Sequence, residues 1–203
     1  MEDLNFIFQI AILVFSIVIH EVSHGAIAYW QGDPTAKYAG RLTLNPAPHI
    51  DPFGSIILPI LMSLSGTGII FGWAKPVPYN PYNLRDQKYG QGMVAAAGPA
   101  SNLAVAVFFG IFMKILLSAG FYDPVFFNFL IYIIFINILL AVFNLVPIPP
   151  LDGSKILFTF LPDSAYRFKA ALEQYGFYLL IFFIFFLFPV IMPIVRWIFN
   201  LIV

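Results

Sequence analysis

Long apolar stretches alternate with short, polar, proline-rich connections along the chain. Four of these stretches, residues 6–30, 92–117, 124–146 and 176–195, have about the 20 residues that a helix needs to cross a bilayer. At the length of this chain, these spans leave little sequence for a separate soluble domain. The pattern predicts an all-α polytopic membrane protein with about four full transmembrane helices, forming a single integral membrane domain over residues 1–203.

Two further segments break the simple pattern of spans. The apolar stretch at residues 53–73 contains Pro59 and then the run Ser-Leu-Ser-Gly-Thr-Gly, which is typical of a turn. Residues 189–203 contain Pro189, Pro193 and Arg196, which favour a kinked or interfacial end over another crossing. A short helix is expected around residues 166–174, in the connection before the last span.

Composition agrees with a membrane protein and excludes several kinds of site. The chain is 61% hydrophobic and only 10% charged, whereas a soluble domain carries about 25% charged residues. Basic and acidic residues balance at 10 each, so the net charge says nothing about nucleic acid; no nucleic-acid partner is expected of this membrane protein. The chain has no cysteine, which excludes disulfides and thiolate metal sites.

The first span ends in a motif that carries chemistry. Residues 20–24 read His-Glu-Val-Ser-His, and on a helix the two histidines point in directions only about 40° apart, so both can bind one metal ion. Glu21 lies one step round the helix, where it can reach a water molecule beside the metal without being a ligand. The alternative is that these three polar side chains lie near the end of the span and only extend toward the membrane surface. However, placing an ionisable group inside a span costs free energy, and such groups are usually functional.

A catalytic zinc ion usually has three protein ligands, and two residues are candidates for the third. One is His49, the remaining histidine; the other is Asp152, in the run Asn-Leu-Val-Pro-Ile-Pro-Pro-Leu-Asp-Gly at residues 144–153. The three prolines of this run prevent regular helix at membrane depth, which is tolerated only around a protein-lined cavity. Two ionised carboxylates, Asp152 and Glu21, would also balance the charge of Zn²⁺. An ordinary turn aspartate before Gly153 stays an alternative.

These motifs together resemble the site-2 protease family of intramembrane zinc metalloproteases. That family combines H-E-x-x-H in one span with N-x-x-P-x-P-x-x-L-D-G at the end of a later span, as residues 20–24 and 144–153 do here. Residues 98–102, Gly-Pro-Ala-Ser-Asn, are similar to the family's G-P-x-x-N. Residues 40–46 and 72–78 resemble a compact prokaryotic subgroup without PDZ or CBS domains.

The resemblance implies one Zn²⁺ per chain, held by His20, His24 and Asp152, with Glu21 as the catalytic base. It implies that Asn144 binds the substrate backbone or the oxyanion. Asn102 could support the substrate or the oxyanion in the same way, or could join packed spans through its amide. His49 matches no ligand position of the family.

The implied reaction is hydrolysis of a peptide bond in or near the transmembrane segment of a membrane-protein substrate, as in regulated intramembrane proteolysis. The partners are then that substrate and the lipid bilayer, and a homo-oligomer stays open. Three other functions also stay open: a non-haem iron enzyme, because two histidines and a carboxylate also bind Fe(II); a metal transporter that uses the same ligands; and an inactive homologue that binds membrane helices.

The ligands also constrain the topology, because metal bonds of about 2 Å require them to lie at one membrane depth. The second span must then begin on the face where the first span ends, so residues 53–73 are expected to form a re-entrant hairpin on that face. Most basic residues lie in the connections on this face, which predicts that the active site faces the cytoplasm of a prokaryotic cell membrane. A small β element is expected at residues 40–46, where it could pair with an extended substrate.

Overall fold

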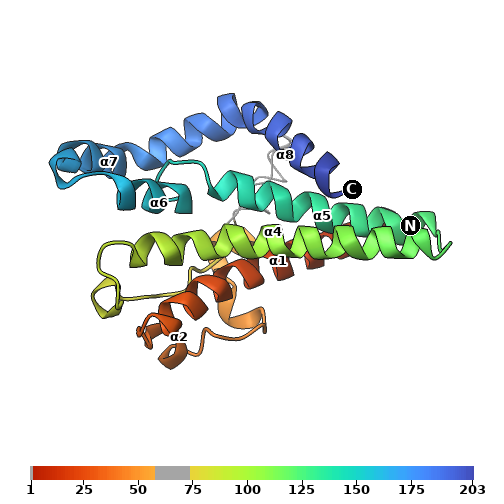
Figure 1. The fold of residues 1–203 in the computed structure, drawn as a ribbon, viewed down its shortest axis with the longest axis horizontal. Helices are drawn as coiled ribbons and strands as arrows, with labels where there is room; N and C mark the ends of the chain where they lie inside the picture. Colours follow the sequence, from red (N-terminus) through yellow and green to blue (C-terminus); the bar gives the residue numbers. More distant parts are fainter. Residues whose placement is uncertain (1, 58–73) are drawn as a thin grey trace.

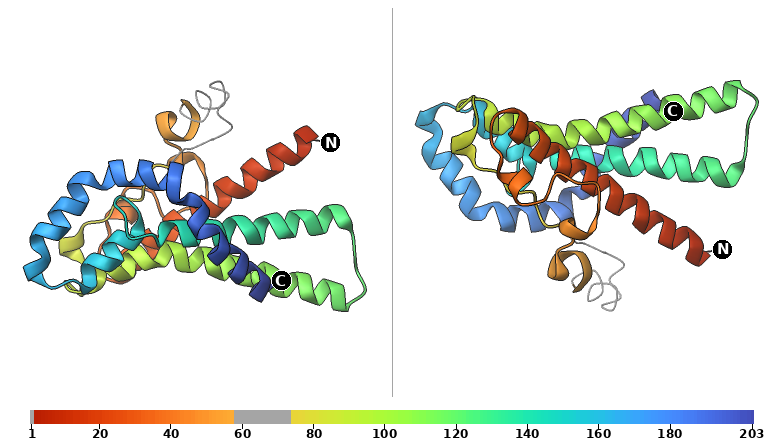
Figure 2. Two further views of the ribbon diagram at one scale, coloured as in Figure 1. Left: turned by 90° about the horizontal axis from the view of Figure 1, so that it is seen from above. Right: turned by 90° about the horizontal axis from the view of Figure 1, so that it is seen from below.

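Three long helices run side by side along the longest axis of the molecule (Figure 1). They are α1 (Glu2–Trp30), α4 (Gly90–Ser118) and α5 (Pro124–Asn144). The structure, a computed structural model, describes residues 2–57 and 74–203. Helix α4 packs against both α1 and α5, and the N-terminal part of α1 diverges from the other two helices (Figure 2).

The predicted all-α membrane fold is confirmed. Among the described residues, four helical stretches are long and apolar enough to cross a membrane: Phe8–Trp30, Gly90–Ser118, Pro124–Asn144 and Asp163–Ile202. Their apolar side chains form a core between α4, α5 and the C-terminal helix, in which Ile134, Ile138 and Val195 are completely buried.

A tight turn joins α4 to α5. Gly120 has a φ of 76°, and its N–H donates to the carbonyl of Leu117 while that of Phe121 donates to Leu116. This pair of bonds is a Schellman motif, which needs a residue in the left-handed region and therefore favours glycine. Helix α5 then begins at Pro124, with the Asp123 side chain accepting from the N–H of Phe126 at 2.7 Å. The turn makes α4 and α5 antiparallel.

The fourth helical stretch is longer than predicted. It contains α7 (Tyr166–Phe182), a wide π-helical turn (Phe183–Leu187) and α8 (Phe188–Ile202). The short helix expected around residues 166–174 is present, but it is the first part of α7, which continues through Gly176 to Phe182. Gly176 lies against Pro149, where a side chain would not fit. The stretch bends between α7 and α8 (Figure 1), and Pro189 occupies the first turn of α8.

The connection from α1 to α4 contains only short helical elements in its described parts. These are α2 (Thr35–Tyr38), 3-10 turns at Ala47–His49 and Pro81–Asn83, and a π-helical turn at Pro52–Ile57. The helix α6 (Asp152–Phe160) follows α5, and a 3-10 turn (Asp163–Ala165) precedes α7.

The small β element expected at residues 40–46 is not formed; the described residues 2–57 and 74–203 contain no strand. Local side-chain bonds bend this segment instead. The hydroxyl of Thr43 accepts from the N–H of Asn45, and the side chain of Asn45 accepts from the N–H of Ala47. Such bonds compete with strand pairing, so the segment turns rather than extends.

The end of α1 and the start of α4 lie at the same end of the molecule (Figure 1). This is the arrangement that the metal ligands require. The predicted re-entrant hairpin at residues 53–73 falls mostly on residues 58–73, which lie outside the described part of the chain.

Asp33 joins the end of α1 to the connection before α4. It is completely buried and accepts hydrogen bonds from Thr35, from the N–H of Asn80 at 2.7 Å and from the side chain of Asn83 at 2.9 Å. Burial by itself raises the pKa of Asp33, but these hydrogen bonds outweigh it and hold the pKa below its usual value. Asp33 is therefore an anchor that prefers to be ionised.

We expect Asp33→Asn to lower the free energy of unfolding by about 1–3 kcal/mol at pH 7, because Asn80 loses its charged acceptor. Since the folded pKa is depressed, the contribution of Asp33 is fully present above its unfolded pKa of about 3.9 and is lost as the pH falls through the folded value. Thermal unfolding in detergent should therefore show a smaller loss of stability for the variant than for the wild type on acidification from pH 5. The exposed Asp163 provides the control Asp163→Asn; an equal effect there would contradict the anchor role.

Candidate functional site

Three potential metal ligands come together from two distant parts of the chain. His20 and His24 lie one turn apart on α1, and Asp152 is the first residue of α6. The Asp152 Oδ2 atom is 3.0 Å from His20 Nε2 and 3.2 Å from His24 Nε2. All three side chains are buried, and their candidate ligand atoms lie within 4.8 Å of one another. The cluster could hold one metal ion.

Both imidazoles are oriented by acceptors on α4. His20 Nδ1 lies 2.6 Å from the Asn102 side-chain oxygen, and His24 Nδ1 lies 2.7 Å from the carbonyl oxygen of Val94. A carbonyl oxygen can only accept, so each Nδ1 carries a proton. Acceptors of this kind orient the ligating histidines of metal sites. These bonds leave Nε2 as the nitrogen that each histidine can offer to a metal ion.

Asp152 reaches the histidines because the chain turns sharply after α5. Helix α5 ends at Asn144, and the proline-rich residues 145–151 lead into α6. Gly153 packs directly on the carbonyl oxygens of Leu145 and Val146, where any side chain would overlap them. This glycine lets the first turn of α6 fold back against the end of α5, which brings Asp152 to the histidines.

Gly98 of α4 leaves the space beside the imidazole nitrogens open. A methyl group on this residue would lie 2.5 Å from the Nε2 atoms of both His20 and His24, closer than any non-bonded carbon can approach. Gly98 and Asn102 are one helical turn apart, so the same face of α4 both opens the site and orients His20. Glycine is required here for the close approach of α4 to the ligands.

The donor set fits zinc. Two imidazole nitrogens and one carboxylate oxygen are ligands of catalytic zinc, and tetrahedral bonds of about 2.0–2.2 Å place ligand atoms about 3.3–3.5 Å apart. The observed separations of 3.0 and 3.2 Å are close to this spacing. Among the described residues the cluster offers three protein ligands, the number that a catalytic zinc site uses.

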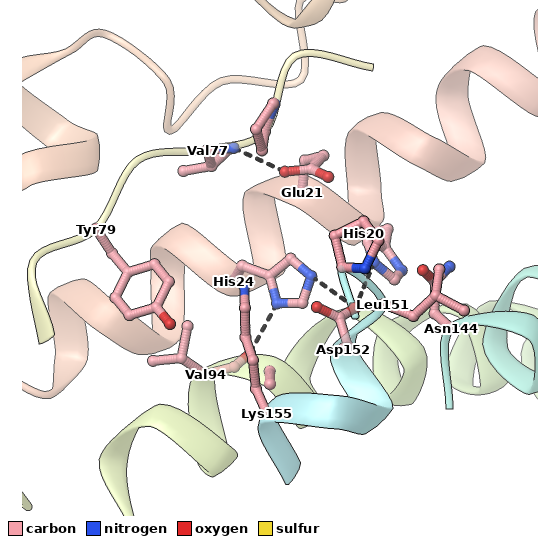
Figure 3. Close-up of a pocket in the computed structure, with 13 residues that line it drawn as sticks. His20, Glu21, His24, Val77, Tyr79, Val94, Asn144, Leu151, Asp152 and Lys155 are labelled. Carbon is pink, nitrogen blue, oxygen red and sulfur yellow. Dashed lines mark hydrogen bonds and ion pairs between the residues drawn. The ribbon is translucent and has the colours of Figure 1, made fainter. Parts of the chain in front are cut away.

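A cavity of about 150 Å³ opens beside the cluster (Figure 3). It has room for several water molecules. Glu21 lies on its wall, and its Oε2 atom accepts a hydrogen bond of 2.7 Å from the N–H of Val77. Tyr79 and Lys155 also line the cavity, with the Lys155 ammonium 5.6 Å from the centre of the Tyr79 ring. A carboxylate that is not among the clustered ligands therefore faces the same space as the ligands.

Asn144 lines the cavity, whereas Asn102 lies behind the ligands. The side-chain nitrogen of Asn144 donates to the carbonyl of Leu140 in its own helix. Asn102 is completely buried, and its side-chain nitrogen donates to the Ser16 carbonyl and to the Asn137 side chain. With its oxygen on His20, the Asn102 amide is fully used, so the geometry favours orientation of His20 over contact with a substrate.

His49 lies apart from the cluster. It is buried in the connection after α1, and its Nε2 atom is 3.0 Å from the carbonyl oxygen of Thr43. The group of clustered ligands found among the described residues does not include it.

Several contributing groups were not singled out from the sequence. The amide nitrogen of Asn137 donates to the Ser16 hydroxyl, which completes a buried polar chain from His20 across α1, α4 and α5. An asparagine in the middle of an apolar span is a signal that could have identified Asn137. The carbonyl of Val94 carries no such signal, because every residue has a backbone carbonyl.

Comparisons with known proteins agree with this geometry. The profile of Peptidase family M50 matches residues 117–187, which include the Asn144-to-Gly153 run. The chain is 39% identical over 171 residues to "Putative zinc metalloprotease YwhC" of Bacillus subtilis, covering 81% of this chain and 74% of that protein. It is 34% identical to "Putative zinc metalloprotease Rip2" of Mycolicibacterium smegmatis, covering 87% of this chain and 66% of that protein. It is 30% identical to "Putative zinc metalloprotease MJ0611" of Methanocaldococcus jannaschii, covering 76% of this chain and 71% of that protein.

The search of solved structures gives no match. The family therefore follows from the relatives, of which the chain spans about two thirds to three quarters, and agrees with a ligand cluster that fits zinc. The membrane-spanning helices and the paired motifs carry the same conclusion: this chain belongs to peptidase family M50, the family of the site-2 proteases.

Proposed function

We propose that the protein is an intramembrane zinc endopeptidase that cleaves a peptide bond in or near the transmembrane segment of a membrane-protein substrate. The observation that carries this proposal is the cluster of His20, His24 and Asp152 beside Glu21 in one cavity. Three of these four side chains, His20, Glu21 and His24, belong to a helix that is apolar enough to span the membrane. A hydrolytic site at that position acts on chains that reach it from the bilayer.

The roles of the residues follow from their positions. When bound, zinc supplies a Lewis acid that polarises the scissile carbonyl and activates water. Glu21 accepts the proton of the attacking water and later gives it to the leaving amine. His20, His24 and Asp152 hold the metal through the atoms that already converge. Asn144 contacts the substrate backbone from the cavity's edge, after its amide leaves the carbonyl of Leu140.

The cavity is suited to an extended peptide rather than a helix. A transmembrane helix keeps its carbonyls in internal hydrogen bonds, so a substrate must unwind locally before one of its carbonyls can reach the metal. The buried ligands and the cavity of about 150 Å³ admit a short unwound segment and exclude a complete helix, whose diameter is about 10 Å.

We further propose that the cavity opens toward the cytoplasm. The basic residues of the connections follow the end of α1, precede α4 or follow α5. In the proposed topology these positions all lie on the same face of the membrane. They are Lys37, Arg41, Lys75, Arg85, Lys88, Lys155, Arg167 and Lys169. Positively charged connections are typical of the cytoplasmic side of a membrane protein.

The experiment that tests the function is metal-dependent cleavage of a model single-span substrate by the purified protein. We expect cleavage by the protein as isolated, one equivalent of zinc by metal analysis, loss of cleavage after chelation and recovery when zinc is returned. Mass spectrometry of the products should place the cut in or beside the span. Iron in place of zinc would support the oxidative alternative, and zinc without cleavage of any membrane substrate would support a transporter or an inactive helix-binding protein.

A further inference from the structure

An extended segment crosses α1 at the proposed catalytic base. Residues 74–80 form no helix or strand, and Pro76, Val77 and Tyr79 line the cavity (Figure 3). The N–H of Val77 donates to Glu21 Oε2 at 2.7 Å. The two residues are 56 positions apart in the chain, so this contact is a tertiary one that the fold must maintain.

The sequence of the segment isolates a single donor at this point. Val77 stands between Pro76 and Pro78, and proline has no backbone N–H, so Val77 carries the only N–H of these three residues. A residue before proline is also biased toward extended backbone, which applies to both Lys75 and Val77. The Pro-Val-Pro run therefore presents one fixed N–H and no competing donor.

Both ends of the segment are tied to buried polar residues outside the metal cluster. The N–H of Lys75 donates to the carbonyl of His49 at 2.9 Å, and the N–H of Asn80 donates to Asp33 at 2.7 Å. His49 and Asp33 are both buried. His49 and Asp33, which are not proposed metal ligands, therefore hold the segment in place on either side of Val77.

The side chain of Val77 fixes the position along the segment. Val77 is only 6% exposed, and it packs on Gly25, the residue after the second histidine. A methyl group on Gly25 would lie 2.8 Å from Val77 Cγ1 and from Leu42 Cδ2. Glycine at residue 25 is therefore what allows Val77 to approach α1 closely enough for its N–H to reach Glu21.

We propose that the backbone N–H of Val77 is a positioning group for catalysis, which holds one oxygen of Glu21 so that the other is presented to water in the cavity. The inference rests on the proposed function. Without this bond the Glu21 side chain keeps its length and charge but gains rotational freedom, so the geometry of proton transfer is less often correct. The metal ligands and the substrate contacts do not depend on the bond.

The sharpest test replaces a single peptide bond by an ester. Incorporating the α-hydroxy analogue of valine at residue 77 removes the N–H and keeps the side chain. We expect kcat to fall about 10- to 100-fold, as for loss of a hydrogen bond to a charged group, while KM stays within about twofold and the zinc content stays at one equivalent. The matched control is the corresponding ester at Tyr122, an exposed residue of the turn between α4 and α5 that does not line the cavity and whose N–H makes no hydrogen bond in the described part of the chain; it should have the kcat of the wild type.

A genetic test gives an independent outcome. Val77→Ala keeps the N–H but loses packing on Gly25, so its kcat should fall less than that of Val77→Pro, which removes the N–H and should reproduce the ester. A Val77 ester with wild-type kcat, or one that changes only KM, would overturn the inference while leaving the proposed function intact. A wild-type protein that binds zinc but cleaves no membrane substrate would instead defeat the proposed function, and this inference with it.

Discussion

Replacing Glu21 by glutamine is expected to abolish cleavage and leave zinc binding unchanged. Glutamine has the same shape and can still accept the hydrogen bond from Val77 through its side-chain oxygen, but it cannot take a proton from water. General base catalysis contributes about 10²–10⁴-fold, and here the same carboxylate also returns the proton to the leaving amine. We therefore expect a loss of at least about 1,000-fold in kcat.

The measurement is the cleavage rate of the model substrate together with zinc content and thermal stability in detergent. Glu173→Gln provides a matched control, because it is the same substitution at an exposed position of α7. Wild-type cleavage by Glu21→Gln would remove Glu21 from the mechanism. Loss of zinc in that variant would show instead that the carboxylate helps to hold the metal.

A single methyl group on Gly98 is expected to empty the metal centre of a folded protein. The added Cβ would lie 2.5 Å from the Nε2 atoms of both histidines, so the imidazoles must turn away from the position in which they converge with Asp152. Alanine favours a helix over glycine by about 1 kcal/mol, so α4 itself should tolerate the change. We expect Gly98→Ala to lower zinc affinity by at least about 100-fold and to remove activity at limiting zinc.

Gly92→Ala is the matched control for Gly98→Ala. It is the same substitution on the same helix, and its Cβ is equally crowded, at 2.6 Å from the Thr159 hydroxyl. The crowding there involves a threonine side chain rather than the metal ligands, so zinc affinity should stay within about threefold of the wild type by metal titration. Equal zinc loss in the two variants would indicate that helix packing, and not access to the nitrogens, controls binding.

The sequence predicts the membrane fold well because the bilayer imposes a simple rule on length and hydropathy. The four predicted spans match the four apolar helical stretches of the described residues. The prediction is wrong where local chemistry decides, because Thr43 and Asn45 form side-chain bonds that replace the expected strand. The helix expected around residues 166–174 is present but continues to Phe182 as α7.

For the site, sequence reasoning identified the residues that converge but not all of the groups that hold them. From spacing alone the third ligand was open between His49 and Asp152; the resemblance favoured Asp152, and the structure brings Asp152 within 3.2 Å of both histidines. The orientation of His24 by the carbonyl of Val94 depends on how closely two helices pack. No residue pattern encodes this backbone contact, so only the folded structure shows it.

The separation of the ligands along the chain has a further consequence for stability. His20 and Asp152 are 132 residues apart, so one ion bound to both closes a loop that contains α4 and α5. Such a loop exists only while these helices stay assembled, because the unfolded chain has no preformed site. By thermodynamic linkage, free zinc at 100 times its dissociation constant adds about 2.7 kcal/mol to the unfolding free energy. The ion at the reaction centre therefore also acts as a reversible cross-link between α1 and α6, and its removal lowers the free energy of unfolding of a bundle that is still assembled.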